Sequence, residues 1–301
     1  MPTHTDATPT HASDRRQPIQ PGTRVWDEIG QITFSLTAGA AFLLQAMEPS
    51  IAAVVDEHST FRTDPFGRAF RSVASVMTWI YGGEEALVEA DRLRAIHTTL
   101  NSVDAQGVRH TALAPGPWAW VMQTGAYAML EASTYFSRQP LSAAEKETLY
   151  QETTQVWRNL GVREKEIPAT YPELVEHVES GIDHHLYASD VAHDVLKVTR
   201  KPPPPPGLPT AFNPLWRLLI TPAARLQYFV LIGTTPESAR RKLGVRWTPI
   251  DEAALRVFGK VVAHTVPLLP ERLRYFPIAY EARQYERSRQ RLRRALQMRP
   301  M

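Results

Sequence analysis

His97 is the residue whose type and surroundings most clearly suggest chemistry. Leu93, Ile96 and Leu100 surround it at the spacing of one helical face. On such a face the imidazole would join a buried apolar stripe, where a ring nitrogen without a partner costs about 1–3 kcal/mol. That partner could be a neighbouring carbonyl or hydroxyl group, or it could be an iron ion. Both interpretations stay open on this segment alone.

A second group of candidate residues lies about 25 residues upstream and consists of Arg68, Arg71 and Ser72. Arg68 and Ser72 are four residues apart, so they share a face if residues 66–81 form a helix. A guanidinium can stabilise negative charge on reacting oxygen atoms, and a hydroxyl group can pass a proton. Alternatively, Arg68 pairs with Asp64 at the start of the helix and Ser72 only packs.

Three segments, in this order, resemble the family typified by latex clearing protein, a rubber oxygenase, and by the oxygenase of mycophenolic acid biosynthesis. Residues 64–72 read D-P-F-G-R-A-F-R-S, where the family has D-P-x-x-R-x-x-x-T. Residues 94–97 read R-A-I-H, and residues 269–277 read L-P-E-R-L-R-Y-F-P. The resemblance extends over residues 25–285.

This resemblance implies a haem b protein in which His97 is the axial ligand of the iron. Its other ring nitrogen would then donate to a carbonyl or carboxylate group that fixes the tautomer. The resemblance also places Arg68, Arg71 and Ser72 around the space where dioxygen and an apolar small-molecule substrate meet, with Arg68 among the haem-binding residues. It implies cleavage of a carbon–carbon double bond or insertion of oxygen. The sequence contains no nicotinamide or flavin fingerprint, so electrons would come from the substrate or an external donor.

Two departures from the family pattern bear on the substrate. Ser72 stands where the family usually has Thr, which keeps the hydroxyl group but loses the methyl that restricts its rotamers. Arg71 stands where rubber oxygenases have a Lys that can occupy the sixth iron position, and arginine stays protonated and is a poor ligand. We therefore expect a smaller apolar substrate than rubber.

Other interpretations remain open. The segment 173–193 is rich in His and acidic residues, and His177 and His184 share a helix face, but a di-iron site would need Glu-x-x-His elements on two helices. A solvated face is the favoured reading of that segment. The chain could also be a non-catalytic haem- or ligand-binding helical protein. A third possibility is a helical interaction protein without haem, in which His97 has a partner in the core.

Helix signals dominate the sequence and predict an all-α fold with a single large multi-helix domain and a buried haem pocket. Start signals include the capping-box pair Ser142 and Glu145 and the Thr248-Pro249 dipeptide. Helices are predicted over residues 28–47, 66–81, 84–101, 117–136, 142–159, 172–198, 236–243, 249–264 and 278–297. The domain is expected to span residues 25–285 after a disordered tail at 1–24, with a polyproline strap at 202–206 inside it and a basic helix or tail at 286–301.

Composition limits the classes of partner. The 301 residues carry a net charge of +3, which gives no reason to expect nucleic-acid binding, and 43% hydrophobic residues suffice for a sizeable core. The absence of Cys excludes disulfides, iron–sulfur clusters and thiolate-ligated haem, and fits a reducing compartment. The apolar run 32–44 is too short for a membrane span, and residues 1–20 lack a secretory signal. We therefore expect a cytoplasmic protein. Residues 271–301 hold nine Arg and three Glu, so this end is either solvated or touches phosphate or an anionic lipid surface.

Overall fold

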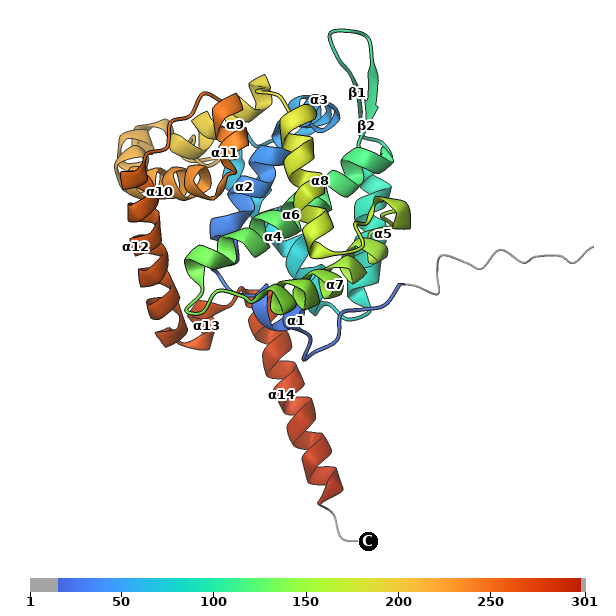
Figure 1. The fold of residues 1–301 in the computed structure, drawn as a ribbon. Helices are drawn as coiled ribbons and strands as arrows, with labels where there is room; N and C mark the ends of the chain where they lie inside the picture. Colours follow the sequence, from blue (N-terminus) through green and yellow to red (C-terminus); the bar gives the residue numbers. More distant parts are fainter. Residues whose placement is uncertain (1–15, 299–301) are drawn as a thin grey trace, which may run out of the picture.

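The structure is a computed structural model that describes residues 16–298 (Figure 1). The part described consists of helices and one two-stranded hairpin, which confirms the all-α prediction. The helices are α1 (Arg24–Glu28), α2 (Phe34–Ala46), α3 (Pro49–His58), α4 (Pro65–Tyr81), α5 (Glu85–His97), α6 (Pro115–Phe136), α7 (Ala143–Asn159), α8 (Tyr171–His184), α9 (Asp190–Arg200), α10 (Asn213–Thr234), α11 (Glu237–Lys242), α12 (Pro249–Thr265), α13 (Glu271–Arg274) and α14 (Pro277–Gln297). Short 3₁₀ turns lie at Glu164–Glu166, Thr210–Phe212 and Val266–Leu268 (η2, η3 and η4).

Helices α2 and α6 lie at the centre of the body and pack closely along their lengths (Figure 1). Small side chains allow this approach, since Ala40, Ala41 and Ala128 form a buried cluster between them. The side-chain amide of Gln45 donates to the carbonyl of Val121, 3.2 Å away, and so ties the two helices together with a polar contact. The other helices surround this pair.

Helices α4 and α5 form an antiparallel hairpin, and α4 also packs against α14 and α1. The Asp64 carboxylate accepts the Gly67 amide at 2.9 Å and caps the start of α4. Gly83, with φ +57°, makes the turn between the helices in a conformation that other residues rarely adopt. At about 1.5 Å of rise per residue, Arg68 and His97 both lie about 20 Å from this turn, so the hairpin brings them to the same end.

Two of the predicted helices are interrupted. The helix predicted over 172–198 is in fact two, because Ser189 caps α9 by accepting the Ala192 amide, and its hydroxyl donates to the carbonyl of Ala46. The helix predicted over 28–47 is broken between α1 and α2, where the Ile32 amide donates to the Arg274 carbonyl at 2.9 Å. Both breaks are set by tertiary contacts.

Several elements were absent from the prediction, among them α3, the two-stranded hairpin and α10. Strands β1 (Asn101–Val103) and β2 (Arg109–Thr111) pair antiparallel where a helix was predicted to continue to residue 101. The Asp104 carboxylate closes their turn by accepting the Val108 amide at 2.9 Å, and Gly107 has φ +80°. Helix α10 was also absent from the prediction, and Pro222 lies inside it. Together, η3 and α10 form a helical segment over residues 210–234 that is long and apolar enough to cross a membrane. Of the most apolar part of this segment, 22% is buried inside the protein.

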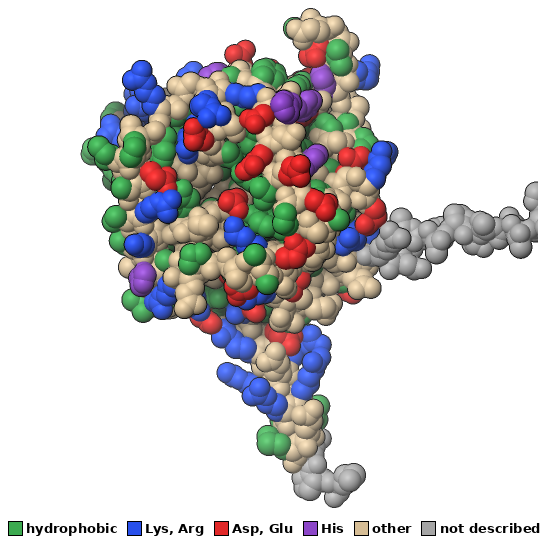
Figure 2. Space-filling view, viewed as in Figure 1, with side chains coloured by type: hydrophobic (Ala, Val, Ile, Leu, Met, Phe, Trp, Pro, Cys, Tyr) green, Lys and Arg blue, Asp and Glu red, His purple; other side chains and the backbone are tan. Residues whose placement is uncertain are grey.

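The segments at the ends of the domain lie as follows. A disordered tail was expected over residues 1–24. The backbone amide of Gln17 donates to the Asn159 side chain and Ile19 is buried, so residues 16–24 lie against the body instead. Residues 1–15 are outside the described part. The polyproline strap 202–206 runs over the surface, and the Trp216 indole donates to the Pro202 carbonyl at 3.5 Å. Helix α14 projects from the body, and basic side chains cover its outer part (Figures 1 and 2).

Candidate functional site

The two ends of the α4–α5 hairpin differ in packing. Near the turn, Met77, Ile80 and Ala90 are almost fully buried. At the far end, every residue of 65–76 and 91–97 is either partly buried or exposed. The sequence candidates Arg68, Arg71, Ser72 and His97 all belong to this far end, which we call the open end of the hairpin. The site is therefore less enclosed than the sequence predicted.

His97 is the last residue of α5 and is held by its own helix. Its Nδ1 lies 2.8 Å from the Leu93 carbonyl oxygen, and because a carbonyl only accepts, Nδ1 carries the proton. The ring meets Trp118 edge-on, with 5.2 Å between the ring centroids. Burial lowers the His97 pKa, although the bond to Leu93 acts in the opposite direction. The imidazole is thus neutral at physiological pH.

The other ring nitrogen of His97, Nε2, has no hydrogen-bond partner within residues 16–298. A neutral imidazole with Nδ1 bound to a carbonyl and Nε2 free is the arrangement typical of a metal-binding histidine. The structure corrects the sequence analysis in one respect. The stripe around His97 is not buried, because Ile96 is exposed and Leu93 is half-buried. No cluster of three or more possible metal ligands occurs in the described residues, so an iron here would need a group such as a porphyrin to supply further ligands.

Arg68 carries a positive charge without an acidic partner. Its guanidinium lies over the Phe42 ring, 3.7 Å from the centroid, and forms no ion pair within the described chain. Burial and the nearby Arg71 lower the pKa of Arg68 to about 10, so it is still protonated at neutral pH. The proposed pairing of Arg68 with Asp64 is wrong, because Asp64 caps α4 and pairs with Arg71 at 3.4 Å.

Arg71 and Ser72 make different contacts from Arg68. The Arg71 side chain is 61% exposed and also donates to the Thr60 hydroxyl at 3.0 Å. The Ser72 hydroxyl donates to the Arg68 carbonyl, 3.1 Å away on the same helix. The structure therefore brings Arg68 and His97 to one end of the hairpin, with Arg71 paired on the outside and Ser72 bound to its own backbone.

Aromatic side chains at the open end are left uncovered. Phe66 meets Trp216 of α10 edge-on at 5.6 Å between centroids but is otherwise largely exposed, and Phe70 is 72% exposed. A flat apolar macrocycle would cover such side chains, and the free Nε2 of His97 could bind its iron. The residues at this end fit haem in these two respects.

Sequence reasoning missed the contacts that support His97 from behind. Arg94 donates to the Leu160 carbonyl at 3.0 Å, and the Trp118 indole donates to the same carbonyl at 3.1 Å. The pair therefore joins α5 and α6 to the end of α7, where Gly161 has φ +70°. The R-x-x-H spacing drew attention to Arg94, but nothing in the sequence indicated that Trp118 would donate to the same carbonyl.

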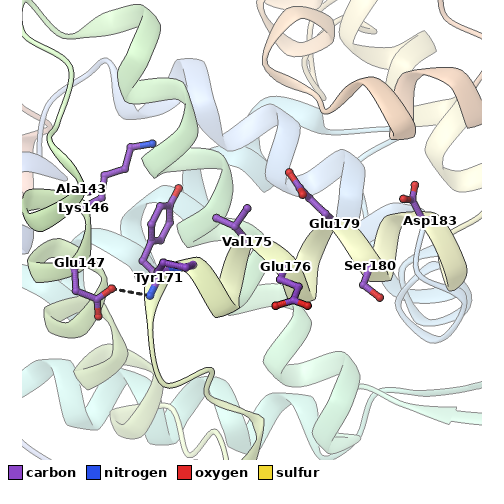
Figure 3. Close-up of a pocket in the computed structure, with 10 residues that line it drawn as sticks. Ala143, Lys146, Glu147, Tyr171, Val175, Glu176, Glu179, Ser180 and Asp183 are labelled. Atoms are coloured by element: carbon purple, nitrogen blue, oxygen red, sulfur yellow. Dashed lines mark hydrogen bonds between the residues drawn. The ribbon is translucent and has the colours of Figure 1, made fainter.

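A groove lies elsewhere, between α7 and α8 (Figure 3). It measures about 630 Å³, and no residue of α4 or α5 lines it. Acidic side chains dominate its rim, and the Glu147 carboxylate accepts the Tyr171 amide at 2.8 Å. His177 and His184 on α8 are exposed, in agreement with the solvated face predicted for this segment.

Fold and site together define an all-helical protein with a free imidazole nitrogen and an unpaired guanidinium at the open end of one hairpin. Residues 26–264 match the family model described as "ER-bound oxygenase mpaB/B'/Rubber oxygenase, catalytic domain". The chain belongs to this family, and the match supports an oxygenase. It includes the first two sequence motifs and ends before the third. No curated protein and no solved structure is significantly similar to the chain.

Proposed function

We propose that this protein is a haem b-dependent oxygenase that acts on an apolar small molecule. The observation that carries the proposal is the state of His97, with Nδ1 bound to the Leu93 carbonyl and Nε2 free. Membership of an oxygenase family supports the class of reaction. Dioxygen is the co-substrate, and an external donor supplies electrons where the reaction needs them. The prediction of a cytoplasmic location is kept as part of this proposal.

Each residue of the open end has a defined task in this proposal. When bound, haem would supply an iron that binds and activates dioxygen. His97 would hold that iron through Nε2, while Leu93 fixes the tautomer and ring orientation. Arg68, charged and without an acidic partner, would stabilise negative charge that develops on the reacting oxygen atoms. Phe66 and Phe70 would pack against the apolar surface of the haem.

Arg71 and Ser72 have supporting tasks. The Ser72 hydroxyl donates a hydrogen bond to the Arg68 carbonyl, so its lone pairs remain free to accept a hydrogen bond from a neighbouring group. It would relay a proton only after its O–H rotates away from that carbonyl toward another acceptor. Arg71 is held by Asp64 and Thr60, and a guanidinium is a poor ligand, so Arg71 would not bind the iron. These assignments favour cleavage of a double bond or oxygen insertion in a molecule smaller than rubber.

The proposal is tested by the absorption spectrum of the purified protein before and after titration with hemin. We expect a Soret band that saturates at one haem per chain, with haem b identified by a pyridine haemochrome assay. A protein that stays colourless after reconstitution overturns the proposal and favours an interaction protein. A stable Soret band without oxygen uptake on any apolar alkene would favour a non-catalytic haem-binding protein.

A further inference from the structure

One side of helix α10 is apolar and uncovered. Leu215, Leu218, Leu219 and Leu226 are all exposed, and the second and third of these are 73% and 68% exposed. At 3.6 residues per turn they form a single stripe on the helix. A stripe of this size on a described helix that touches no partner marks an interaction surface.

The opposite side of α10 is anchored in the body. Ala224 and Leu231 are buried on that side, and so are the neighbours Val230 and Ile232 near the end of the helix. The segment 210–234 is long and apolar enough to span a membrane, but a crossing would pull these residues out of the core. The leucine stripe is available only to a partner that covers the helix from outside, with its axis lying along the partner's surface.

The charges around the stripe indicate the chemistry of that partner. Residues 195–236 contain no Asp or Glu, and Arg217 and Arg225 are both exposed. At 3.6 residues per turn Arg225 borders the leucine stripe, while Arg217 lies around the helix from it. Helix α12, which packs against α10, continues the pattern, since Val257 and Val261 are exposed and Lys260 lies between them. Hydrophobic and basic side chains lie along the edge of the molecule formed by these helices (Figure 2).

We propose that the exposed face of α10, together with the adjoining face of α12, binds the surface of a membrane that contains anionic lipids. The leucines enter the boundary between headgroups and acyl chains, and Arg217 and Arg225 meet lipid phosphates. A second copy of the chain would cover the leucines, but it would place the same arginines near one another without acidic partners. The charge pattern therefore favours the lipid surface. This inference does not depend on haem.

The experiment is co-sedimentation of the full chain with phosphatidylcholine vesicles, with and without phosphatidylglycerol. We expect binding to the anionic vesicles, reduced at least about tenfold by Leu218→Asp with Leu219→Asp. The matched control, Val88→Asp with Val103→Asp, changes two similarly exposed apolar residues on other elements and should leave binding intact. Replacing Arg217 and Arg225 by Gln should reduce binding to anionic vesicles by about fivefold per residue.

Three outcomes would overturn this inference. The leucine variant could bind vesicles as well as the wild type does. Binding could instead be lost when Arg291, Arg293 and Arg294 of α14 are changed to Gln, which would assign it to the projecting helix. Sedimentation velocity could also reveal a dimer that the leucine variant dissociates, with no vesicle binding at all. Circular dichroism checks the fold of each variant, and Leu218→Ser with Leu219→Ser replaces the Asp variant if that one unfolds.

Discussion

The two halves of the α4–α5 hairpin have the same helical backbone but opposite packing. Near the turn, Met77 and Ile80 are buried, and the Tyr81 hydroxyl donates to the Trp26 carbonyl at 2.6 Å. At the open end, Phe70 is exposed and His97 keeps a ring nitrogen free. The buried half stabilises the hairpin. The open half carries polar groups without a hydrogen-bond or ion-pair partner in the described chain, namely the Nε2 of His97 and the guanidinium of Arg68. Polar groups that are held on a helix but have no partner within the protein are typical of a binding site.

Replacing His97 tests the open half most directly. His97→Ala removes the only proposed iron ligand, and we expect haem affinity to fall by at least about a hundredfold, because loss of a second-shell partner alone costs 10–100-fold. Hemin titration followed at the Soret band measures this. The exposed His193 of α9 serves as the control, since His193→Ala should bind haem normally. Full haem occupancy in His97→Ala would show that the open half of the hairpin does not bind the haem iron through His97.

Met77→Ala tests the buried half. Met77 is 1% exposed, so truncation should lower the free energy of unfolding by about 2–5 kcal/mol, with haem binding unchanged once the protein is folded. Urea unfolding of the haem-free protein measures the change. Phe70→Ala is the matched variant at the open end, where we expect a change within about 0.5 kcal/mol but weaker haem binding. Equal destabilisation by both variants would remove the contrast between the halves.

Arg68→Met sharpens the comparison, because it separates charge from packing. The haem-loaded variant should consume oxygen about a hundredfold more slowly, the loss typical of one stabilising donor, and should keep its Soret band. The haem-free variant should be no less stable than the wild type, since Arg68 has no acidic partner to lose. Arg62→Met is the contrast, because Arg62 lies 2.6 Å from both Asp56 and Asp194. A stability loss in Arg68→Met as large as in Arg62→Met would contradict this assignment.

The sequence was sufficient where local signals decide the structure. Ser142 and Glu145 form the predicted capping box at the start of α7, and the helices predicted over 66–81 and 117–136 are found as α4 and α6. It was insufficient where a distant contact decides. The break before α9 depends on the hydroxyl of Ser189 reaching Ala46.

The same limit applies to the site and to α10. His97 was recognised from its neighbours in sequence, but the support from Trp118 and the exposure of Ile96 follow from how α5 meets α6. Helix α10 has an internal proline and apolar residues on both sides, so its pattern lacks the polar face that predicts a surface helix. Its leucine stripe is visible only once the opposite side is seen to be buried.

The smallest effect we expect is a pH dependence of stability that originates at His97. Burial keeps the His97 pKa in the folded protein below its usual value near 6.5. Above that value the imidazole is neutral in both states and has no effect. As the pH falls below it, the unfolded chain binds a proton that the folded protein resists, so the wild type loses stability relative to His97→Gln. Unfolding midpoints of the haem-free proteins at pH 8 and pH 5.5, with the exposed His193→Gln as control, measure the difference. Parallel behaviour of wild type and His97→Gln would show that the ring is solvated in the folded protein and would contradict the lowered pKa.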